Sequence, residues 1–237
     1  MLNVLNQLLT DHRPATACMF VEGRWIRDAA DWHEVENPAD EALIARTPAG
    51  GANVAEVALD AARRAQPAWA ARPAVERGRA VAALADQVRQ HADLLAHIVV
   101  AEQGKPLDQA RGETGGTENF LRLSAEQARR IEGKILPSDA PDEEIQIRRL
   151  PHGVVLGPTA WNYPSALAGR KIGPALVARN SFILRAHDFT PLSGLAAFAE
   201  TAGIPPGVLR STATASTANG CKASIPDGAV RAWRGGR

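Results

Sequence analysis

Trp161 and Asn162 stand in the most informative stretch of this sequence, between an apolar run and a predicted helix. Val154 to Leu156 predicts a buried strand, and Pro164 suits the first position of a helix because its missing N–H would have no partner there. The turn between them would lie at the carboxyl end of a strand, where α/β folds bind ligands. An Asn side chain in that place can stabilise an oxyanion that develops during a reaction. The alternative is a turn Asn that bonds only the local backbone.

Two further motifs follow this turn, and the three together carry a resemblance. This chain resembles the aldehyde dehydrogenase superfamily, in particular its semialdehyde dehydrogenase branch. The resemblance is carried by the run from Gly153 to Pro164, by Arg170-Lys171-Ile-Gly-Pro-Ala-Leu176 and by Thr190-Pro-Leu-Ser193. The resemblance covers about residues 19–209. It implies oxidation of a small-molecule aldehyde to an acid. In that reaction a Cys thiolate attacks the aldehyde, a hydride leaves to the nicotinamide, and a Glu-activated water hydrolyses the thioester.

The resemblance assigns roles to three polar residues. Asn162 matches the amide that stabilises the oxyanion, and Lys171 matches a lysine with a charge-relay or proton-handling role. Arg170 matches an arginine that binds the distal carboxylate of a semialdehyde through its two-pronged guanidinium. For Lys171 the alternative is a solvated helix lysine or one that neutralises nearby carboxylates. For Arg170 it is a surface arginine.

The resemblance also implies a cofactor site. It places Thr159, Ala160 and Trp161 against the cofactor, and Arg185 and Asp188 where the family holds the adenosine ribose with a Lys and a Glu. Here the family pattern Lys-Pro-Ser-Glu is replaced by Arg-Ala-His-Asp, so both charges are kept and the Pro is lost. A carboxylate at a strand end binds ribose hydroxyls and repels a 2′-phosphate, which favours NAD over NADP. The alternative is a local ion pair.

Cys18 and Cys221 both lack the sequence context of the family nucleophile. Cys18 reads as a small buried hydrophobe at a strand, and Cys221 lies in an atypical tail. The chain alone is therefore expected to be inactive. Two cysteines form no disulfide framework and fit a reducing cytoplasm, and no residue spacing predicts a metal site.

The composition excludes several partners. A net charge of +1 gives no sign of nucleic-acid binding, and no apolar run reaches membrane-spanning length. Residues 1–10 lack the features of a signal peptide and predict a short amphipathic helix instead. A hydrophobic content of 45% in 237 residues supports a substantial core.

The expected fold is α/β: a partial Rossmann-like parallel sheet with flanking helices, an amino-terminal helical region and a protruding antiparallel β arm. The pattern predicts a hairpin over 19–26, strands over 33–36 and 43–47, and helices over 53–66, 73–91, 92–103 and about 105–131. Asn53 and Glu56 resemble a capping box for the first of these helices, and Pro67 is expected to end it.

Polar and apolar residues alternate over 134–136 and 144–149, which predicts two antiparallel strands. The resemblance implies that this arm joins an oligomerisation sheet and so forms a homo-oligomer. The alternative is a surface hairpin packed on its own domain. Strands over 154–156 and 181–184, alternating with helices over 164–178 and 191–202, then predict βαβ units.

The pattern ends after Leu209. Of the 28 residues from Arg210 to Arg237, 20 are Ala, Ser, Thr, Gly or Arg, so we expect this tail to be disordered. The abrupt change indicates a frameshift. We predict segments 1–131 (cofactor-domain strands and helices), 132–150 (the arm), 151–209 (βαβ units) and 210–237 (the tail). The resemblance therefore implies the amino-terminal half of an NAD-dependent aldehyde dehydrogenase, truncated and inactive alone. The rival interpretations are a non-catalytic nucleotide-binding or oligomerisation module and one half of a split enzyme.

Overall fold

The structure is a computed structural model that describes residues 15–16, 19–21, 24–26, 31–194, 198 and 202–213. The predicted helix over 1–10, both cysteines and the tail beyond 213 lie outside the described residues. The strands are β1 (Ala15–Thr16), β2 (Met19–Val21), β3 (Arg24–Ile26), β4 (Asp31–Glu36), β5 (Leu43–Ala49), β6 (Lys134–Pro137), β7 (Glu144–Ile147), β8 (Val154–Pro158), β9 (Ser181–Ala186) and β10 (Leu209–Ala213). The helices are α2 (Ala52–Ala71), α3 (Ala74–Gln90), α4 (Ala92–Gln103), α5 (Leu107–Gln127) and α6 (Pro164–Val177).

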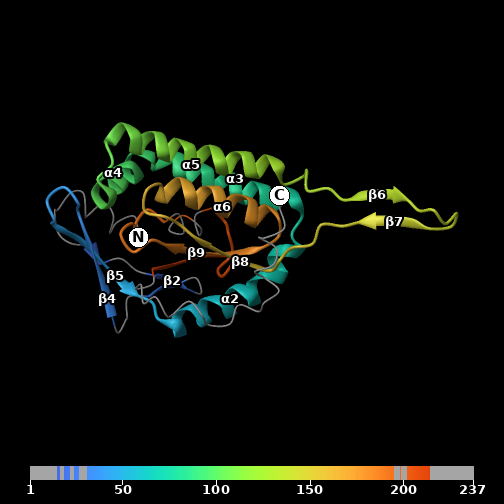
Figure 1. Cartoon of the computed structure of the whole chain (residues 1–237), viewed down its shortest axis with the longest axis horizontal. Coiled ribbons are helices and arrows are strands. Elements are labelled where there is room, and N and C mark those ends of the chain that lie inside the picture. The colour runs from blue at the N-terminus through green and yellow to red at the C-terminus, as the bar shows by residue number, and fades with distance from the viewer. Residues whose placement is uncertain are drawn as a thin grey trace.

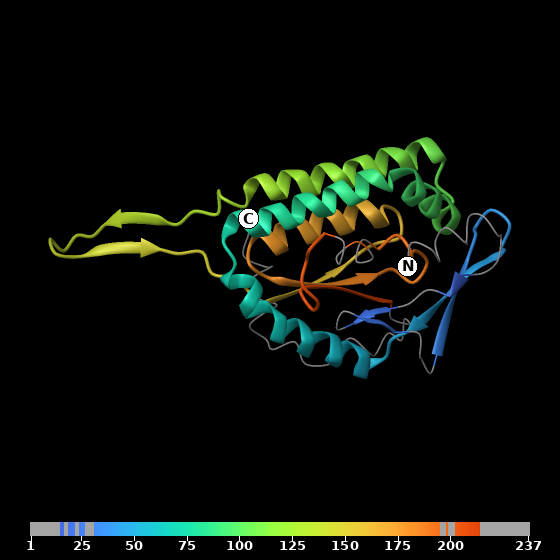
Figure 2. The same cartoon turned by 180° about the vertical axis from the view of Figure 1, so that it is seen from behind.

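A five-stranded sheet in the order β3-β2-β10-β9-β8 forms the middle layer. β8, β9 and β10 run parallel, and the β2–β3 hairpin joins them antiparallel to β10. Helix α2 covers one face, and α6 with α3 and α5 beyond it covers the other (Figures 1 and 2). The parallel pairing and the predicted hairpin over 19–26 are thus confirmed in the described strands.

Alternate residues of β9 build the core on both faces of the sheet. Ile183 packs with Ala58 and Ala62 of α2. Phe182 and Leu184 point to the opposite face, where they join a larger cluster that includes residues of α3, α5 and α6. β8 approaches closely at Gly157, where a Cβ would lie 2.0 Å from the Phe182 ring. This packing holds the carboxyl ends of β8 and β9 at one edge of the sheet.

The residues after Leu209 differ from the expectation. Arg210 to Ala213 continue β10 between β9 and β2, so the prediction that disorder begins at residue 210 is wrong for these four residues. A strand between two others gains its order from backbone hydrogen bonds on both sides, which do not need large apolar side chains. Arg210 and Thr212 are buried there.

Helix α2 also departs from the expectation, since it continues through Pro67 to Ala71. It begins after Gly51, so Asn53 and Glu56 lie inside the helix and the predicted capping box is wrong. The last turn is held by Trp69, whose buried indole donates a hydrogen bond to the Leu176 carbonyl at 2.9 Å. Such tertiary packing offsets the one backbone hydrogen bond that a proline removes.

The remaining helices follow the pattern with shifted ends. α3 and α4 match their predicted ranges, and Gly104 closes α4 with a left-handed φ of 75°. α5 ends at Gln127, before the predicted residue 131. Pro191 was expected to open a helix, but Leu192 and Ser193 form a turn, and most of the rest of that segment lies outside the described residues.

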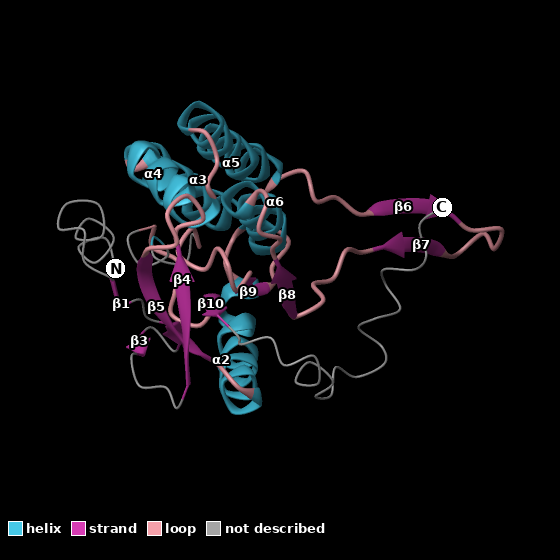
Figure 3. Cartoon of the chain, turned by 60° about the vertical axis from the view of Figure 1, so that its left-hand side comes forward, coloured by secondary structure: helices cyan, strands magenta, loops and turns pink. Residues whose placement is uncertain are grey.

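The predicted arm is a two-stranded antiparallel sheet, with Leu136 opposite Ile145. It extends away from the helices and the main sheet (Figure 3), and every residue of β6 and β7 is exposed. The hairpin therefore does not pack on its own domain. Within the part of the chain that the structure describes, no helix has the length and apolarity to cross a membrane.

Helices α5 and α6 contact each other at their small residues, which yields a stability prediction. A Cβ at Gly173 would lie 2.5 Å from the Ser124 hydroxyl, which is itself bonded to the Phe120 carbonyl. Gly173→Ala is expected to lower the free energy of unfolding by about 1–3 kcal/mol through overpacking. Gly112→Ala in α5 meets open space and should raise it by about 0.5–1 kcal/mol.

Urea denaturation followed by circular dichroism measures both effects in parallel. The interpretation of the α5–α6 contact fails when the two alanine variants have equal unfolding free energies.

Candidate active site

The turn of residues 159–163 joins β8 to α6 at the carboxyl edge of the parallel strands. Its first residue, Thr159, is buried, and its N–H donates to the Arg185 carbonyl of β9 at 2.9 Å. Ala160, Trp161 and Asn162 are exposed. The structure thus joins Thr159 to the strand that carries Arg185, and it presents the next three residues to solvent.

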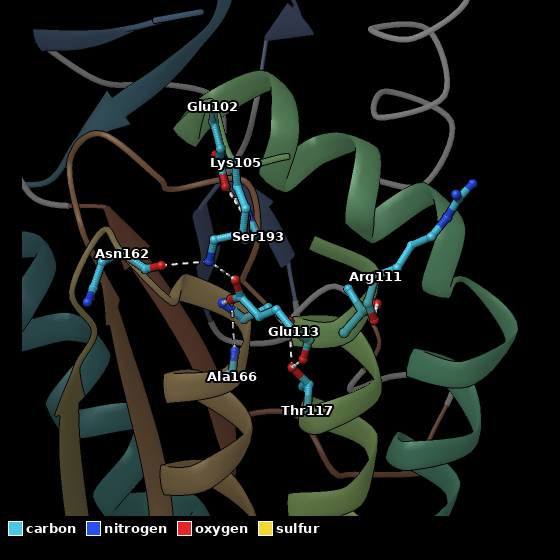
Figure 4. Close-up of polar contacts among 10 residues, drawn as sticks. Glu102, Lys105, Arg111, Glu113, Thr117, Asn162, Ala166 and Ser193 are labelled. Atoms are coloured by element: carbon cyan, nitrogen blue, oxygen red, sulfur yellow. Dashed lines mark hydrogen bonds and ion pairs between the residues drawn. The ribbon is translucent and has the colours of Figure 1, made fainter. Parts of the chain in front are cut away.

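A buried lysine holds the far side of this turn. Lys105 lies between α4 and α5, and its Nζ donates to the Asn162 carbonyl at 2.7 Å and to Glu113 Oε2 at 2.6 Å (Figure 4). The ammonium also lies 3.7 Å from the centroid of the Tyr163 ring. The hydrogen bond from Lys105 is accepted by the backbone carbonyl of Asn162, so the side-chain amide of Asn162 takes no part in it.

Glu113 of α5 binds the start of α6 with its other oxygen. Oε1 accepts from the N–H groups of Ser165 at 2.8 Å and Ala166 at 3.2 Å. The first N–H groups of a helix have no partner within it, and they carry partial positive charge. A carboxylate there accepts their hydrogen bonds and also balances that charge. Thr117, one turn further along α5, bonds the Ser165 hydroxyl at 2.9 Å.

A second carboxylate holds the turn after β9. Glu102, in the last turn of α4, accepts from the N–H groups of Leu192 at 2.8 Å and Ser193 at 2.9 Å, and from the Ser193 hydroxyl. Burial raises the pKa of Glu102 to about 8, against the opposing effect of these hydrogen bonds and with a further rise from the charge of Glu113. Both turns at this edge of the sheet are thus anchored by glutamate side chains of the helical layer.

Sequence reasoning missed Glu102, Lys105 and Glu113, although two of them left a signal. Leu95, Ile98, Val99 and Glu102 share helical spacing and a buried face, so a carboxylate occupies an apolar stripe of α4. Glu113 has the same place on α5, on the buried face with Ala110 and Thr117. A charged residue in such a stripe is rarely buried without a partner.

Lys171 and Arg170 lie on α6 in different surroundings. Lys171 is partly buried and donates through Nζ to the Pro158 carbonyl at the end of β8, and burial lowers the pKa of its ammonium. This contact brings Lys171 beside the turn. Arg170 is exposed, with its guanidinium 4.6 Å from the centroid of the Phe120 ring. Its exposure removes the need for an anionic partner that burial would impose.

Arg185 and Asp188 approach each other at 4.0 Å, with side chains 33% and 15% exposed. This is the local ion pair of the alternative interpretation, and it leaves the carboxylate partly accessible. Among the residues that the structure describes, no group of His, Cys, Asp or Glu could hold a metal ion. The roles of Asn162, Lys171, Arg170 and the cofactor contacts stay predictions.

The raised pKa of Glu102 makes stability pH-dependent. A folded pKa of about 8, above the ordinary 4.5, means that the native state holds an extra proton between these values. Stability from this group is therefore present at low pH and lost as the pH rises through about 8. Relative to Glu102→Gln, the chain is expected to lose about 3 kcal/mol of unfolding free energy between about pH 5 and pH 8.

Urea titrations of both proteins at several pH values measure this difference. Parallel stability curves for the chain and for Glu102→Gln would show that Glu102 is already ionised at pH 5.

Comparisons with known proteins identify the family that this chain resembles. A family model described as "Aldehyde dehydrogenase family" matches residues 25–222. The chain is 42% identical over 195 residues to 3,6-anhydro-alpha-L-galactose dehydrogenase of Vibrio sp. (strain EJY3), covering 81% of this chain and 40% of that protein. It is 40% identical over 192 residues to glutarate-semialdehyde dehydrogenase of Pseudomonas aeruginosa, covering 80% and 40%.

Solved structures give the same result for the fold. Lactaldehyde dehydrogenase from Escherichia coli superposes with a TM-score of 0.83 at 36% identity, covering 85% of this chain and 43% of that chain. A 3,6-anhydro-L-galactose dehydrogenase in complex with NAP gives 0.81 at 41% identity, covering 84% and 42%. The chain spans about 40% of the length of the curated relatives it matches.

Proposed function

Because the chain belongs to the aldehyde dehydrogenase family, we propose that it is the amino-terminal part of an enzyme that oxidises an aldehyde to a carboxylic acid with NAD. The observation that carries the proposal is the turn after β8. Buried groups hold it on two sides, at Thr159 and at the Asn162 carbonyl, while Asn162 itself is exposed. A fixed backbone that presents an accessible amide is what stabilisation of an oxyanion requires.

In the proposed mechanism this chain contributes binding and electrostatics. The Asn162 amide donates to the oxyanion that forms when a thiolate attacks the aldehyde carbonyl. Lys171, with its lowered pKa and its bond to the end of β8, handles a proton beside that turn. The Cys nucleophile and the Glu that activates water would come from the part of the family's sequence that this chain does not span. NAD supplies the hydride acceptor when bound.

The residues at the end of β9 fit the ribose of a nicotinamide cofactor. Asp188 offers a partly accessible carboxylate that accepts from hydroxyls, and Arg185 lies beside it. A 2′-phosphate near this carboxylate would meet repulsion. We therefore assign NAD rather than NADP, with Thr159, Ala160 and Trp161 lining the same edge.

Asp188→Ser is expected to shift the preference of the chain toward NADP by about tenfold, which corresponds to about 1.4 kcal/mol. Titration of the purified chain with each nucleotide by calorimetry measures the ratio of affinities. Asp142→Ser, an exposed carboxylate in the arm, is the matched control and should leave the ratio unchanged. A native chain that already prefers NADP contradicts the ribose assignment.

We further propose a semialdehyde as the substrate class. The support is the Arg170-Lys171 motif and the similarity to glutarate-semialdehyde dehydrogenase. Arg170 is exposed, and its guanidinium stacks on Phe120, so its donors are accessible to a distal carboxylate.

The test of the function compares the chain with the longer protein that the downstream DNA encodes once the reading frame is restored. NADH formation is assayed with succinic semialdehyde and with butanal, an uncharged aldehyde of similar length. We expect no NADH from the chain alone, and activity from the longer protein with a preference for the semialdehyde. Oxidation by the chain alone would contradict the assignment of the nucleophile to the part of the relatives' length that this chain does not span. A separate reading frame for the carboxyl half would favour the split enzyme.

The arm supports a proposal about assembly. Ile135, Leu136, Ile145 and Ile147 are exposed apolar residues on a hairpin whose edges are unpaired within the described chain. Exposed edges and apolar side chains on an extended hairpin favour pairing with another chain. We propose that the arm joins the sheet of a second copy. The same observation favours the rival function, in which the chain only lends its arm to a partner.

A further inference from the structure

The buried ion pair between Lys105 and Glu113 lies between the helical layer and the turn that carries Asn162. The Lys105 side chain is 5% exposed and that of Glu113 is 0% exposed. Both residues come from elements that precede the turn by about 50 residues, at separations of 57 for Lys105–Asn162 and 52 for Glu113–Ser165. A charge pair so deeply buried is costly to form, so stability alone is a weak explanation for its presence.

The two members of the pair hold opposite sides of one short segment. Lys105 donates to the Asn162 carbonyl at 2.7 Å, and Glu113 accepts from Ser165 and Ala166 at 2.8 and 3.2 Å. The two charges are joined to each other at 2.6 Å (Figure 4). The segment between these attachment points is therefore bound at both ends to a single rigid unit.

This geometry distinguishes positioning from catalysis. Both contacts to the turn use its backbone, so neither side chain is directed at a reacting atom through them. A helix start can be capped by a single neutral acceptor. Here the Glu113 carboxylate is instead paired with the Lys105 ammonium, which also donates to the Asn162 carbonyl. The additional contact fixes the backbone of Asn162 relative to the first turn of α6.

We infer that Lys105 and Glu113 are positioning residues that fix the turn bearing Asn162, and this inference rests on the proposed function of that amide. By holding the backbone on both sides, the pair restricts the directions that the Asn162 amide can take. Preorganised donors are effective because they need no rearrangement when charge develops. The same constraint keeps Trp161, which precedes Asn162, in one place for the cofactor.

The experiment uses the ¹⁵N-labelled chain and the double variant Lys105→Met/Glu113→Gln. The double variant removes both charges together, so no unpaired buried charge is left to unfold the protein. Arg111→Met is the matched control, because it breaks an exposed ion pair of α5 with Asp93. Backbone order parameters of Trp161 and Asn162 are measured by relaxation, alongside the thermal midpoint.

The expected result in the double variant is a fall of these two order parameters from about 0.85 to below about 0.6. The order parameters of α3 and β9 should stay close to those of Arg111→Met, and so should the thermal midpoint. An unchanged turn in the folded double variant would overturn the inference. An equal loss of order throughout the chain would do so as well, because the pair would then only stabilise the fold.

Titration with NAD separates this inference from the proposed function. Binding to the native chain is expected to weaken about tenfold in the double variant and to stay unchanged in Arg111→Met. A native chain that does not bind NAD would count against the proposed cofactor site. The order parameters would still decide whether Lys105 and Glu113 position the turn.

Discussion

Lys105→Met is expected to lower the free energy of unfolding of this chain by about 3–5 kcal/mol. The substitution leaves Glu113, whose side chain is 0% exposed, as a buried carboxylate without its cation. The Asn162 carbonyl loses its donor at the same time. Urea denaturation followed by circular dichroism gives the difference directly.

Two variants make this prediction specific. Arg111→Met removes an ion pair whose side chains are 51% and 67% exposed, and should cost less than about 1 kcal/mol. Lys105→Met/Glu113→Gln should recover most of the loss, since no unpaired charge remains. A Lys105→Met protein as stable as Arg111→Met would mean that the Lys105–Glu113 pair does not stabilise the native state.

Asn162→Ala in the longer enzyme is expected to lower kcat by about 100–1000-fold, the usual effect of removing one oxyanion donor. Stability should hardly change, because Asn162 is exposed and its bond to Lys105 uses the backbone carbonyl that alanine keeps. Steady-state assay of NADH formation measures the first effect and thermal unfolding the second.

Gln109→Ala, which removes an exposed amide from α5, is the control and should leave kcat unchanged. The oxyanion role of Asn162 is wrong if its alanine variant keeps kcat within a factor of about three while folding normally. A loss of activity that follows a loss of stability would assign Asn162 to the structure instead.

Local signals in the sequence predicted the turn and its neighbours. The apolar run before Gly157 and the proline at 164 placed Asn162 between β8 and α6, as the structure has it. The alternating pattern over 134–149 predicted the arm, and Gly104 marked the end of α4. These features depend on backbone conformations and apolar periodicity within a few residues, which adjacent residues encode.

Features that depend on contacts between distant residues could not be predicted from the sequence. Pro67 lies inside α2 because Trp69 reaches the end of α6, and Arg210 to Ala213 are ordered because β9 and β2 lie on either side. Neither outcome follows from the residues next to it. In both, tertiary packing overrides a local preference worth only a few kcal/mol.

The sequence by itself determined which residues stand at the turn and that Asn162 and Lys171 belong to one strand–turn–helix unit. Only the tertiary structure decided what holds that unit, namely Lys105 and Glu113 from the helical layer, and Glu102 for the neighbouring turn. Whether a carboxylate is solvated or buried against a helix start depends on which faces pack together. That choice is made by the whole chain, because burying a charge is favourable only when its partners arrive from other elements.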